Sequence, residues 1–188
     1  MKSSIAIALL VSTLPVCAQD LEVLTTETRG TVLPVVPEVV AAMQDAMASE
    51  GVAGAIPVCR ELAPKLVRKK REETGWDIRR VSLKTRNPER ATPDAWEAVQ
   101  LADFDRRAAS GERPETLEKS EIVSVDGRPV LRYMKALPVS DVCLNCHGPA
   151  EGLDPALRRK LSETYPDDRA TGYVKGQIRG ALTVKRPL

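Results

Sequence analysis

Apolar residues recur at intervals of three and four along residues 37–49 and 55–74, and this spacing predicts two amphipathic helices. The second stretch contains Pro64, which cannot donate to the carbonyl of Arg60, so we expect that helix to kink or split just after Cys59. A third helix is predicted to begin at Thr92-Pro93-Asp94, which supplies an N-cap, a proline and an early acid, and to end near Gly111. Residues 19–33 show no clear period, and we expect them to be extended.

Strand-like alternation is clearest around Asp126-Gly127, a favoured two-residue turn between residues 116–125 and 128–137. β-branched residues alternate on both sides of this turn, which predicts a hairpin. Residues 76–84 and 176–184 are predicted to be further strands, the last with glycines where another segment approaches closely. A polar connection leads from residue 149 to the last strand. This order of elements predicts an α+β fold with a small antiparallel sheet and flanking helices.

The first 18 residues have the pattern of a secretory signal peptide. Lys2 is followed by a short apolar run over residues 5–14, and Val16-Cys17-Ala18 offers small residues before a cleavage site after Ala18. The run is too short to span a bilayer, and no other apolar run approaches that length. We therefore expect a periplasmic or secreted protein in which residues 19–188 form a single domain without an integral membrane segment.

Charged residues nearly balance in this chain. It has 28 basic and 26 acidic residues, a formal net charge of +2, and loss of Lys2 with the leader would lower that charge to +1. Proteins that bind nucleic acids through the phosphate backbone carry a marked excess of basic residues. The sequence therefore predicts no nucleic-acid partner.

The segment Cys143-Leu144-Asn145-Cys146-His147 is a C-x-x-C-H pentapeptide, the attachment signature of a c-type haem. Two cysteines three positions apart lie on one side of a helical turn, where each thiol can add to one vinyl group of the same porphyrin. The adjacent His147 can then bind the iron as an axial ligand. Covalent haem attachment takes place outside the bacterial cytoplasm, which agrees with the leader. The motif predicts one covalently attached haem c.

The other side of that iron has fewer candidates. His147 is the only histidine, so two histidine ligands from this chain are excluded. Outside the leader, the methionines Met43, Met47 and Met134 all precede the motif. We interpret Met43 and Met47 as core residues on a helix face, because methionine commonly fills irregular core space.

Cys59 is the one cysteine that neither the leader nor the haem motif accounts for. In an oxidising compartment it is a buried inert thiol, a disulfide partner for another chain, or a group with its own chemistry, and the residues alone leave these alternatives open. If Cys59 binds ferric iron as a thiolate, it stabilises the oxidised state and favours a low potential. Such a bond weakens on reduction, which suits a switch better than a fast electron carrier.

Several blocks of the sequence, in the same order, resemble one known family. They are residues 55–64 (AIPVCRELAP), 81–88 (VSLKTRNP), 143–148 (CLNCHG), 165–173 (YPDDRATGY) and 180–181. These blocks resemble the exported c-haem-binding domains with a PAS-like fold, long labelled a domain of unknown function. The resemblance spans nearly all of the chain after the leader. It implies a PAS-like fold, a haem held by Cys143 and Cys146, and an axial pair made of His147 and Cys59.

Members of that family occur alone or as the sensing part of histidine kinases and chemoreceptors, and this chain resembles the stand-alone form. The resemblance favours a redox or small-ligand sensor with a redox or signalling protein as its partner. The alternative is a cytochrome that passes electrons to a partner protein. An enzyme, for example of the haem-peroxidase type, is least favoured because no second histidine is available as an acid–base group beside the iron.

Charged residues near these blocks are candidates for lesser roles. Arg79, Arg80 and Arg86 could bind the haem propionates, since a guanidinium matches a carboxylate in shape, although a solvated basic face is the simpler interpretation. Asp167 and Asp168 are expected to stabilise a turn.

Overall fold

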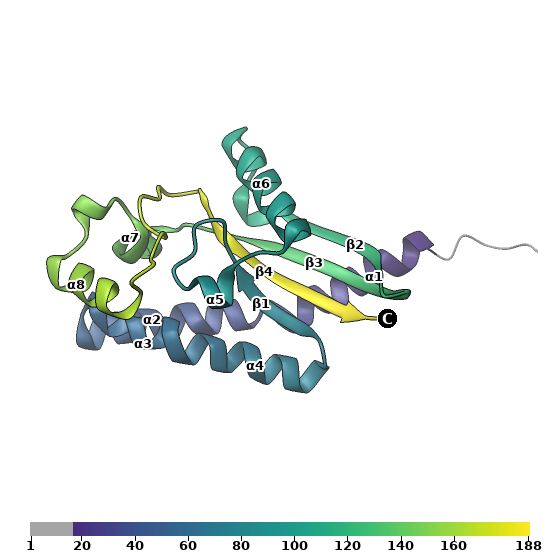
Figure 1. Ribbon diagram of the computed structural model, residues 1–188, viewed down its shortest axis with the longest axis horizontal. Coiled ribbons are helices and arrows are strands. Elements are labelled where there is room, and N and C mark those ends of the chain that lie inside the picture. The colour runs from purple at the N-terminus through teal and green to yellow at the C-terminus, as the bar shows by residue number, and fades with distance from the viewer. Residues whose placement is uncertain (1–16) are drawn as a thin grey trace, which may run out of the picture.

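The computed structural model describes residues 17–188, so all of the predicted leader except Cys17 and Ala18 lies outside the described residues. Four strands form one antiparallel sheet in the order β1-β4-β3-β2, with β1 at Asp77–Val81, β2 at Glu118–Val125, β3 at Arg128–Pro138 and β4 at Ile178–Pro187. Helices cover both faces of this sheet (Figure 1). The prediction of an α+β fold with a small antiparallel sheet and flanking helices is confirmed.

The hairpin between β2 and β3 follows the turn that the sequence predicts. Asp126 and Gly127 both have positive φ, 50° and 76°, as a two-residue turn matched to the twist of the strands requires. Close approach also explains a glycine in β4: a Cβ on Gly180 would lie 2.3 Å from the carbonyl oxygen of Val81 in β1. These two positions fix the register at both ends of the sheet.

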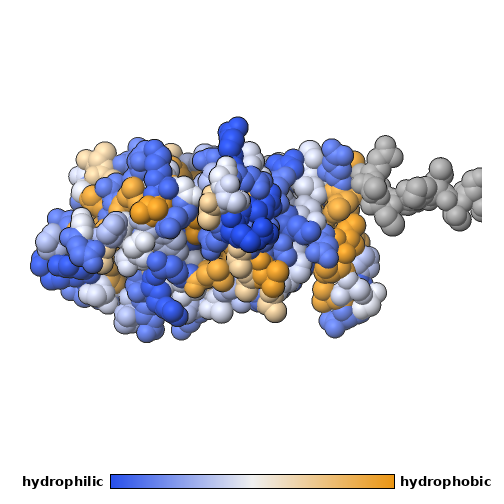
Figure 2. Space-filling model, turned by 90° about the horizontal axis from the view of Figure 1, so that it is seen from above, coloured by the Kyte–Doolittle hydropathy of each residue, from blue (hydrophilic) through white to orange (hydrophobic). Residues whose placement is uncertain are grey.

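Strand alternation divides the core between the two faces of the sheet. On one face, Tyr133, Ile78 and Val184 pack with α1 (Cys17–Val32) and α4 (Ala63–Thr74). On the other face, Met134 packs with residues of α6 (Ala95–Ala109). In Figure 1, α6 rises above the sheet while α1, α2 (Val35–Glu50) and α4 run beneath it. Figure 2 shows that the protruding end of α6 is strongly hydrophilic.

Residues 19–32 belong to α1, which ends at Val32, so the expectation of an extended segment over residues 19–33 is wrong. The helical period is hidden because two of its three buried positions are polar: Thr25, Thr28 and Val32 recur at intervals of three and four. The Thr25 hydroxyl donates to the Leu21 carbonyl, 2.6 Å away, and Thr28 accepts from Arg186 of β4 at 3.2 Å. Two buried positions of α1 are therefore occupied by hydrogen-bonded threonines, and a search for recurring apolar residues does not detect them.

The predicted helix over residues 55–74 is divided, as Pro64 requires. It consists of α3 (Ala55–Pro57), a π-helical turn η2 (Val58–Leu62) and α4, which ends where Gly75 adopts a left-handed conformation. Cys59 lies in the π-helical turn. A further one-turn helix, η1 (Val52–Gly54), joins α2 to this segment after Gly51.

The third predicted helix, α6, begins two residues later than the Thr92-Pro93-Asp94 pattern indicates. Asp94 is its N-cap, and a capping box forms because the Glu97 amide donates to the Asp94 carboxylate at 2.9 Å and the Glu97 carboxylate accepts from the Asp94 amide at 2.8 Å. The segment between β1 and α6 contains the short helix α5 (Pro88–Ala91).

Two helices cluster at one end of the sheet (Figure 1): α7 (Asp141–His147), which carries the C-x-x-C-H motif, and α8 (Pro155–Thr164). The sequence analysis treats α8 as part of a polar connection. Its apolar face consists of Leu157 and Leu161, which pack with Ile56 of α3. Two 3-10 turns, η3 (Pro114–Thr116) and η4 (Ala150–Gly152), complete the fold. Within residues 17–188, no helix has the length and apolarity that crossing a bilayer would require.

Candidate functional site

The three chemically distinctive residues of the motif lie together on α7. Cys143, Cys146 and His147 are all half-buried, and α7 follows directly from the end of β3. Gly148 ends the helix with a close turn, since a Cβ there would lie 2.7 Å from the Leu144 carbonyl oxygen. Burial raises the pKa of the Cys146 thiol to about 11, so this sulfur is a neutral thiol at ordinary pH.

The imidazole of His147 is held in one orientation. Its Nδ1 lies 2.6 Å from the carbonyl oxygen of Ala170, so Nδ1 carries the proton and donates it. Burial, together with the positive charges of Arg179, Arg86 and Arg80, lowers the pKa of His147 far below its usual range. The ring is therefore neutral, and the lone pair of Nε2 is its available acceptor.

Arg179 of β4 lies against that ring without capping Nε2. Its Nε is 3.3 Å from both Nδ1 and Nε2 of His147. The lone-pair directions of the two ring nitrogens diverge, so a donor equally distant from both cannot be in line with either. Nη1 of Arg179 donates to the Ser82 hydroxyl at 2.9 Å and to the Lys84 carbonyl at 3.1 Å, which fixes the guanidinium beside the ring.

The segment of residues 170–177 holds α7 in place through main-chain hydrogen bonds. The Tyr173 amide donates to the His147 carbonyl at 2.9 Å, and the Gly172 amide donates to the Gly148 carbonyl at 2.8 Å. The ring of Tyr173 also meets the His147 ring edge-on, with centroids 6.3 Å apart. The segment therefore orients His147 in three ways: through the backbone of α7, through the ring of Tyr173, and through the Ala170 carbonyl that binds Nδ1 of His147.

Arg86 is a structural clamp on the same helix. Its Nε donates to Asp168 at 2.9 Å and its Nη2 donates to the Cys146 carbonyl at 2.7 Å. Asp168 also accepts from the Ala170 amide at 2.8 Å, so it stabilises a turn as expected. The guanidinium of Arg86 is thus engaged in joining the loop after β1 to α7.

Cys59 lies in the electrostatic surroundings of the motif although 83 residues separate it from Cys143 in the sequence. Its side chain is exposed, yet burial is the largest cause of its raised pKa, with the positive charges of Arg80, Arg86 and Arg179 acting in the opposite direction. The charge of Cys143 also affects this pKa. The structure therefore brings Cys59 to the same side of the fold as α7.

Arg90 secures the π-helical turn that carries Cys59. Pro64 has no amide hydrogen, and Nη1 of Arg90 donates instead to the Arg60 carbonyl at 3.1 Å. Arg90 belongs to α5, which follows β1. The position of Cys59 is thereby tied to the sheet through a contact between residues 30 positions apart.

The two neighbouring arginines of β1 have different surroundings because strand residues alternate between faces. Arg79 forms an ion pair with the fully buried Glu97 of α6, with Nη2 and Oε2 2.6 Å apart. Arg80 points to the other face, where burial lowers its pKa and the neighbouring Cys59 acts in the opposite direction. Within residues 17–188, Arg80 makes no side-chain hydrogen bond and no ion pair.

The three methionines outside the leader are distributed between the core and a helix surface. Met134 is fully buried in the core on the α6 face of the sheet. Met43 and Met47 are half-buried on α2. The interpretation of Met43 and Met47 as core-packing residues agrees with this burial only in part.

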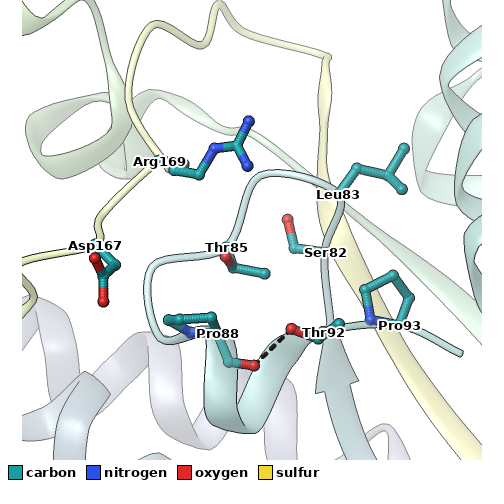
Figure 3. A pocket seen from close by; sticks show the side chains of 8 residues that line it. All are labelled: Ser82, Leu83, Thr85, Pro88, Thr92, Pro93, Asp167 and Arg169. Carbon is teal, nitrogen blue, oxygen red and sulfur yellow. Dashed lines mark hydrogen bonds between the residues drawn. The ribbon is translucent and has the colours of Figure 1, made fainter.

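A hollow of about 310 Å³ lies beside the loop that carries Arg86, and Figure 3 shows the side chains around it. The Thr92 hydroxyl donates to the Pro88 carbonyl at 2.7 Å, which closes α5 on one side of the hollow. In Figure 3 the Arg169 side chain extends away from Asp167, so these two residues do not form an ion pair across it. None of Cys59, Cys143, Cys146 and His147 lines this hollow.

Comparison of the chain with known proteins identifies its family. The model of the Tll0287-like family matches residues 15–187. The chain belongs to the Tll0287-like family. A crystal structure of a family namesake, the cyanobacterial heme-protein Tll0287, is similar with a TM-score of 0.60 and 25% sequence identity, covering 86% of this chain and 95% of that chain. A search of curated protein sequences finds no match.

Membership of the Tll0287-like family agrees with the resemblance noted in the sequence, and the solved relative is a haem protein. Three residues of the site carry no sequence signal of their own: Arg179, Arg90 and Ala170. Each acts through a contact with a residue at least 23 positions away. Their roles follow from the fold and could not be inferred from local spacing.

Proposed function

We propose that this chain is an exported haem protein that carries one haem c, joined through thioether bonds to Cys143 and Cys146, with His147 and Cys59 as axial ligands. The observation that supports it most is that the fold gathers the motif on α7 and the otherwise unexplained Cys59 of η2 into one electrostatic neighbourhood. The solved relative is a haem protein, which agrees with this cofactor.

The residues around the motif suit such a group. Cys59 and Arg80 are both exposed by surface area, although burial dominates the pKa shift of each. A side chain can be accessible to solvent and still surrounded by protein atoms if it lines a concave space, which accounts for both the exposure and the pKa shifts. The donor set is also appropriate, because two thiols of the motif, a neutral imidazole and a third thiol are the groups that bind haem c and its iron.

Each residue would contribute separately. The thiols of Cys143 and Cys146 would each add to one vinyl group: sulfur would bond to one carbon and the thiol hydrogen would pass to the other, so no oxidant would be needed. His147 presents Nε2 because its Nδ1–H is held by Ala170. Bound haem would supply a one-electron redox couple. The positive charges near Cys59 compensate the negative charge of its thiolate once it is bound to a metal.

A sensing role is favoured over electron transfer by the position of Cys59. A ligand on a π-helical turn lies where a helix has two accessible hydrogen-bond registers, and such turns frequently occur at functional sites. A thiolate that leaves ferrous iron could move with that turn and change the surface of the protein. A carrier that must transfer electrons quickly instead benefits from ligands that stay in place.

The test is the ferric EPR and absorption spectrum of the haem-loaded protein and of Cys59→Ser. Removal of a thiolate should abolish the thiolate low-spin signature, shift the Soret band and raise the midpoint potential. Met43→Leu and Met47→Leu are matched controls that should leave the spectrum unchanged. A Cys59→Ser spectrum identical to that of the parent would refute the axial pair, and loss of the signal in a methionine variant would assign the ligand to that methionine.

A further inference from the structure

A second and larger hollow, about 560 Å³, lies between α6 and the segment of residues 172–177. It contains residues from α6, from β4 and from the loop after β1, and none of the proposed haem-binding residues lines it. Its volume is within the range of sites for small organic ligands.

One wall of this hollow contains a carboxylate without a counter-ion. Asp105 of α6 has no ion pair or side-chain hydrogen bond within residues 17–188, and burial alone raises its pKa. The positions three and four residues further along the helix are Ala108 and Ala109, which also line the hollow. A basic residue at either position would pair with Asp105, but alanine cannot, so the exposed carboxylate is open to a ligand in the hollow.

The opposite charge lies in another element of the same hollow. Lys84, from the loop after β1, donates from Nζ to the Thr171 carbonyl at 2.6 Å and lies 4.4 Å from the centroid of the Tyr173 ring. Both of these neighbours are uncharged, and within the described part of the chain Lys84 has no carboxylate partner. Lys175, by contrast, is paired with Asp141 at 2.6 Å. The hollow therefore contains one free carboxylate and one ammonium without an anionic partner, and the two do not form an ion pair with each other.

Apolar residues line the same hollow as these charges. Leu83, which is 45% exposed, Leu101 and Ile178 contribute aliphatic surface to the same hollow. A ligand that fits this pattern needs an ammonium for Asp105, a carboxylate for Lys84 and an apolar group between or beside them. Both charged side chains are exposed, so water already solvates them, but only a dipolar ligand can engage both at once, whereas a simple amine or a simple acid can engage one.

We infer that this hollow binds a zwitterionic α-amino acid with an apolar side chain, its ammonium against Asp105 and its carboxylate against Lys84. The site is separate from the proposed haem-binding residues, so the inference stands or falls independently of the proposed function.

The test is isothermal titration calorimetry of the haem-loaded protein with L-phenylalanine as the probe. Two analogues each lack one charge: 3-phenylpropionate has no ammonium, and L-phenylalaninamide has no carboxylate. We expect saturable one-to-one binding of L-phenylalanine, weakened at least tenfold by Asp105→Asn and by Lys84→Met. Glu163→Gln, on an exposed part of α8, is the matched control and should not change the affinity.

The analogues assign each contact. Asp105→Asn should leave the weak binding of 3-phenylpropionate unchanged, and Lys84→Met should leave that of L-phenylalaninamide unchanged. The inference is overturned if L-phenylalanine shows no saturable binding. It is equally overturned if both variants bind the probe as tightly as the parent, which is also the result that direct coordination of the amine to iron would give.

Discussion

Arg80 is the residue whose charge most directly concerns the proposed site. It lies near Cys59 and Cys143 and, among residues 17–188, has no counter-ion of its own. A fixed positive charge favours the state of a cofactor that has gained an electron, whether the charge acts on the metal–thiolate unit or on a propionate. Arg80→Gln should therefore lower the midpoint potential of the haem-loaded protein by about 30–100 mV, the size of one charge at about 10 Å in a medium of effective dielectric constant near 20.

Arg68→Gln is the matched control for that measurement. Arg68 is exposed on α4, and its replacement removes the same charge without removing a neighbour of Cys59. Spectroelectrochemical titration of both variants distinguishes an effect of the charge near Cys59 from a general effect of removing one positive charge. Equal potentials in the parent and in Arg80→Gln would show that Arg80 does not act on the cofactor.

Asp94 determines part of the acid stability of the fold. Burial tends to raise the pKa of this carboxyl, but the hydrogen bonds from the Glu97 amide, Arg132 and Lys185 prevail and lower the pKa from 3.8 to about 2. A lowered pKa stabilises the folded state above the unfolded-state value, and this contribution is lost as the pH falls through the folded-state value. Asp94→Asn keeps an N-cap acceptor but removes the charge.

We expect Asp94→Asn to lower the free energy of unfolding by about 1–2 kcal/mol at pH 7, with allowance for partial exposure of the carboxylate. Urea denaturation should show about half of this difference at pH 3 and about a sixth near pH 2, where the parent carboxyl is itself about half protonated. Asp45→Asn on the exposed side of α2 is the control. A difference that does not change between pH 7 and pH 2 would contradict the electrostatic explanation.

The sequence identifies individual residues well where their chemistry is local. Cys143, Cys146 and His147 form a contiguous motif, and the unpaired Cys59 follows from a count of cysteines. Arg179 could not be predicted, because its contact with His147 joins β4 to α7 across 32 positions. Arg79 and Arg80 look alike in the sequence, and only the sheet shows that one pairs with a buried glutamate while the other faces Cys59.

At the scale of elements, the π-helical turn η2 depends on a contact from outside its own helix. The Arg60 carbonyl is bound by Arg90, and Arg90→Met would remove this bond without changing the turn's sequence. We expect the ferric haem-loaded variant to show a mixture of spin states, because Cys59 would no longer be held in one position. The free energy of unfolding should fall by about 0.5–1.5 kcal/mol, the usual contribution of one hydrogen bond.

Arg158→Met on the exposed surface of α8 is the control for Arg90→Met. EPR distinguishes a positioning role from a merely stabilising one, since a stability loss alone would leave the low-spin signal homogeneous. A homogeneous signal in Arg90→Met would therefore contradict the positioning role of Arg90.

Elements with apolar periodicity or a specific turn are predictable from this sequence, and those stabilised by buried polar groups are not. The β2–β3 hairpin and the division at Pro64 follow from local chemistry. The helix α1 packs through Thr25 and Thr28, which pattern analysis counts as polar. The start of α6 is set by Glu97, a fully buried carboxylate whose value as a capping residue depends on Arg79 and Thr183 from the sheet.

For the whole molecule, the sheet divides the chain into two functional sides. The proposed haem-binding residues lie at the end occupied by α7 and on the face of Arg80, and the inferred amino-acid site lies towards α6. The segment of residues 170–177 belongs to both: Ala170 holds Nδ1 of His147, whereas Gly172, Tyr173 and Gln177 line the hollow. Occupation of one site can therefore change the position of residues that form the other.

This shared segment predicts coupling between the two sites. Tyr173 contacts His147 with its ring and its amide, so a ligand that orders Tyr173 alters the hydrogen-bonded frame of a proposed iron ligand. Reciprocity requires that a ligand which shifts the potential also binds the oxidised and reduced protein with different affinity. A threefold ratio of affinities corresponds to a shift of about 28 mV for a one-electron couple.

We expect saturating L-phenylalanine to shift the midpoint potential of the haem-loaded protein by about 20–40 mV, and calorimetry on the oxidised and reduced forms to give an affinity ratio of matching size. Tyr173→Leu keeps an apolar wall but loses the ring contact with His147, so it should retain binding and lose most of the shift. A shift that persists in Tyr173→Leu would mean that coupling passes through the backbone hydrogen bonds of the segment instead. No shift in the parent, despite binding, would show that the two sites act independently.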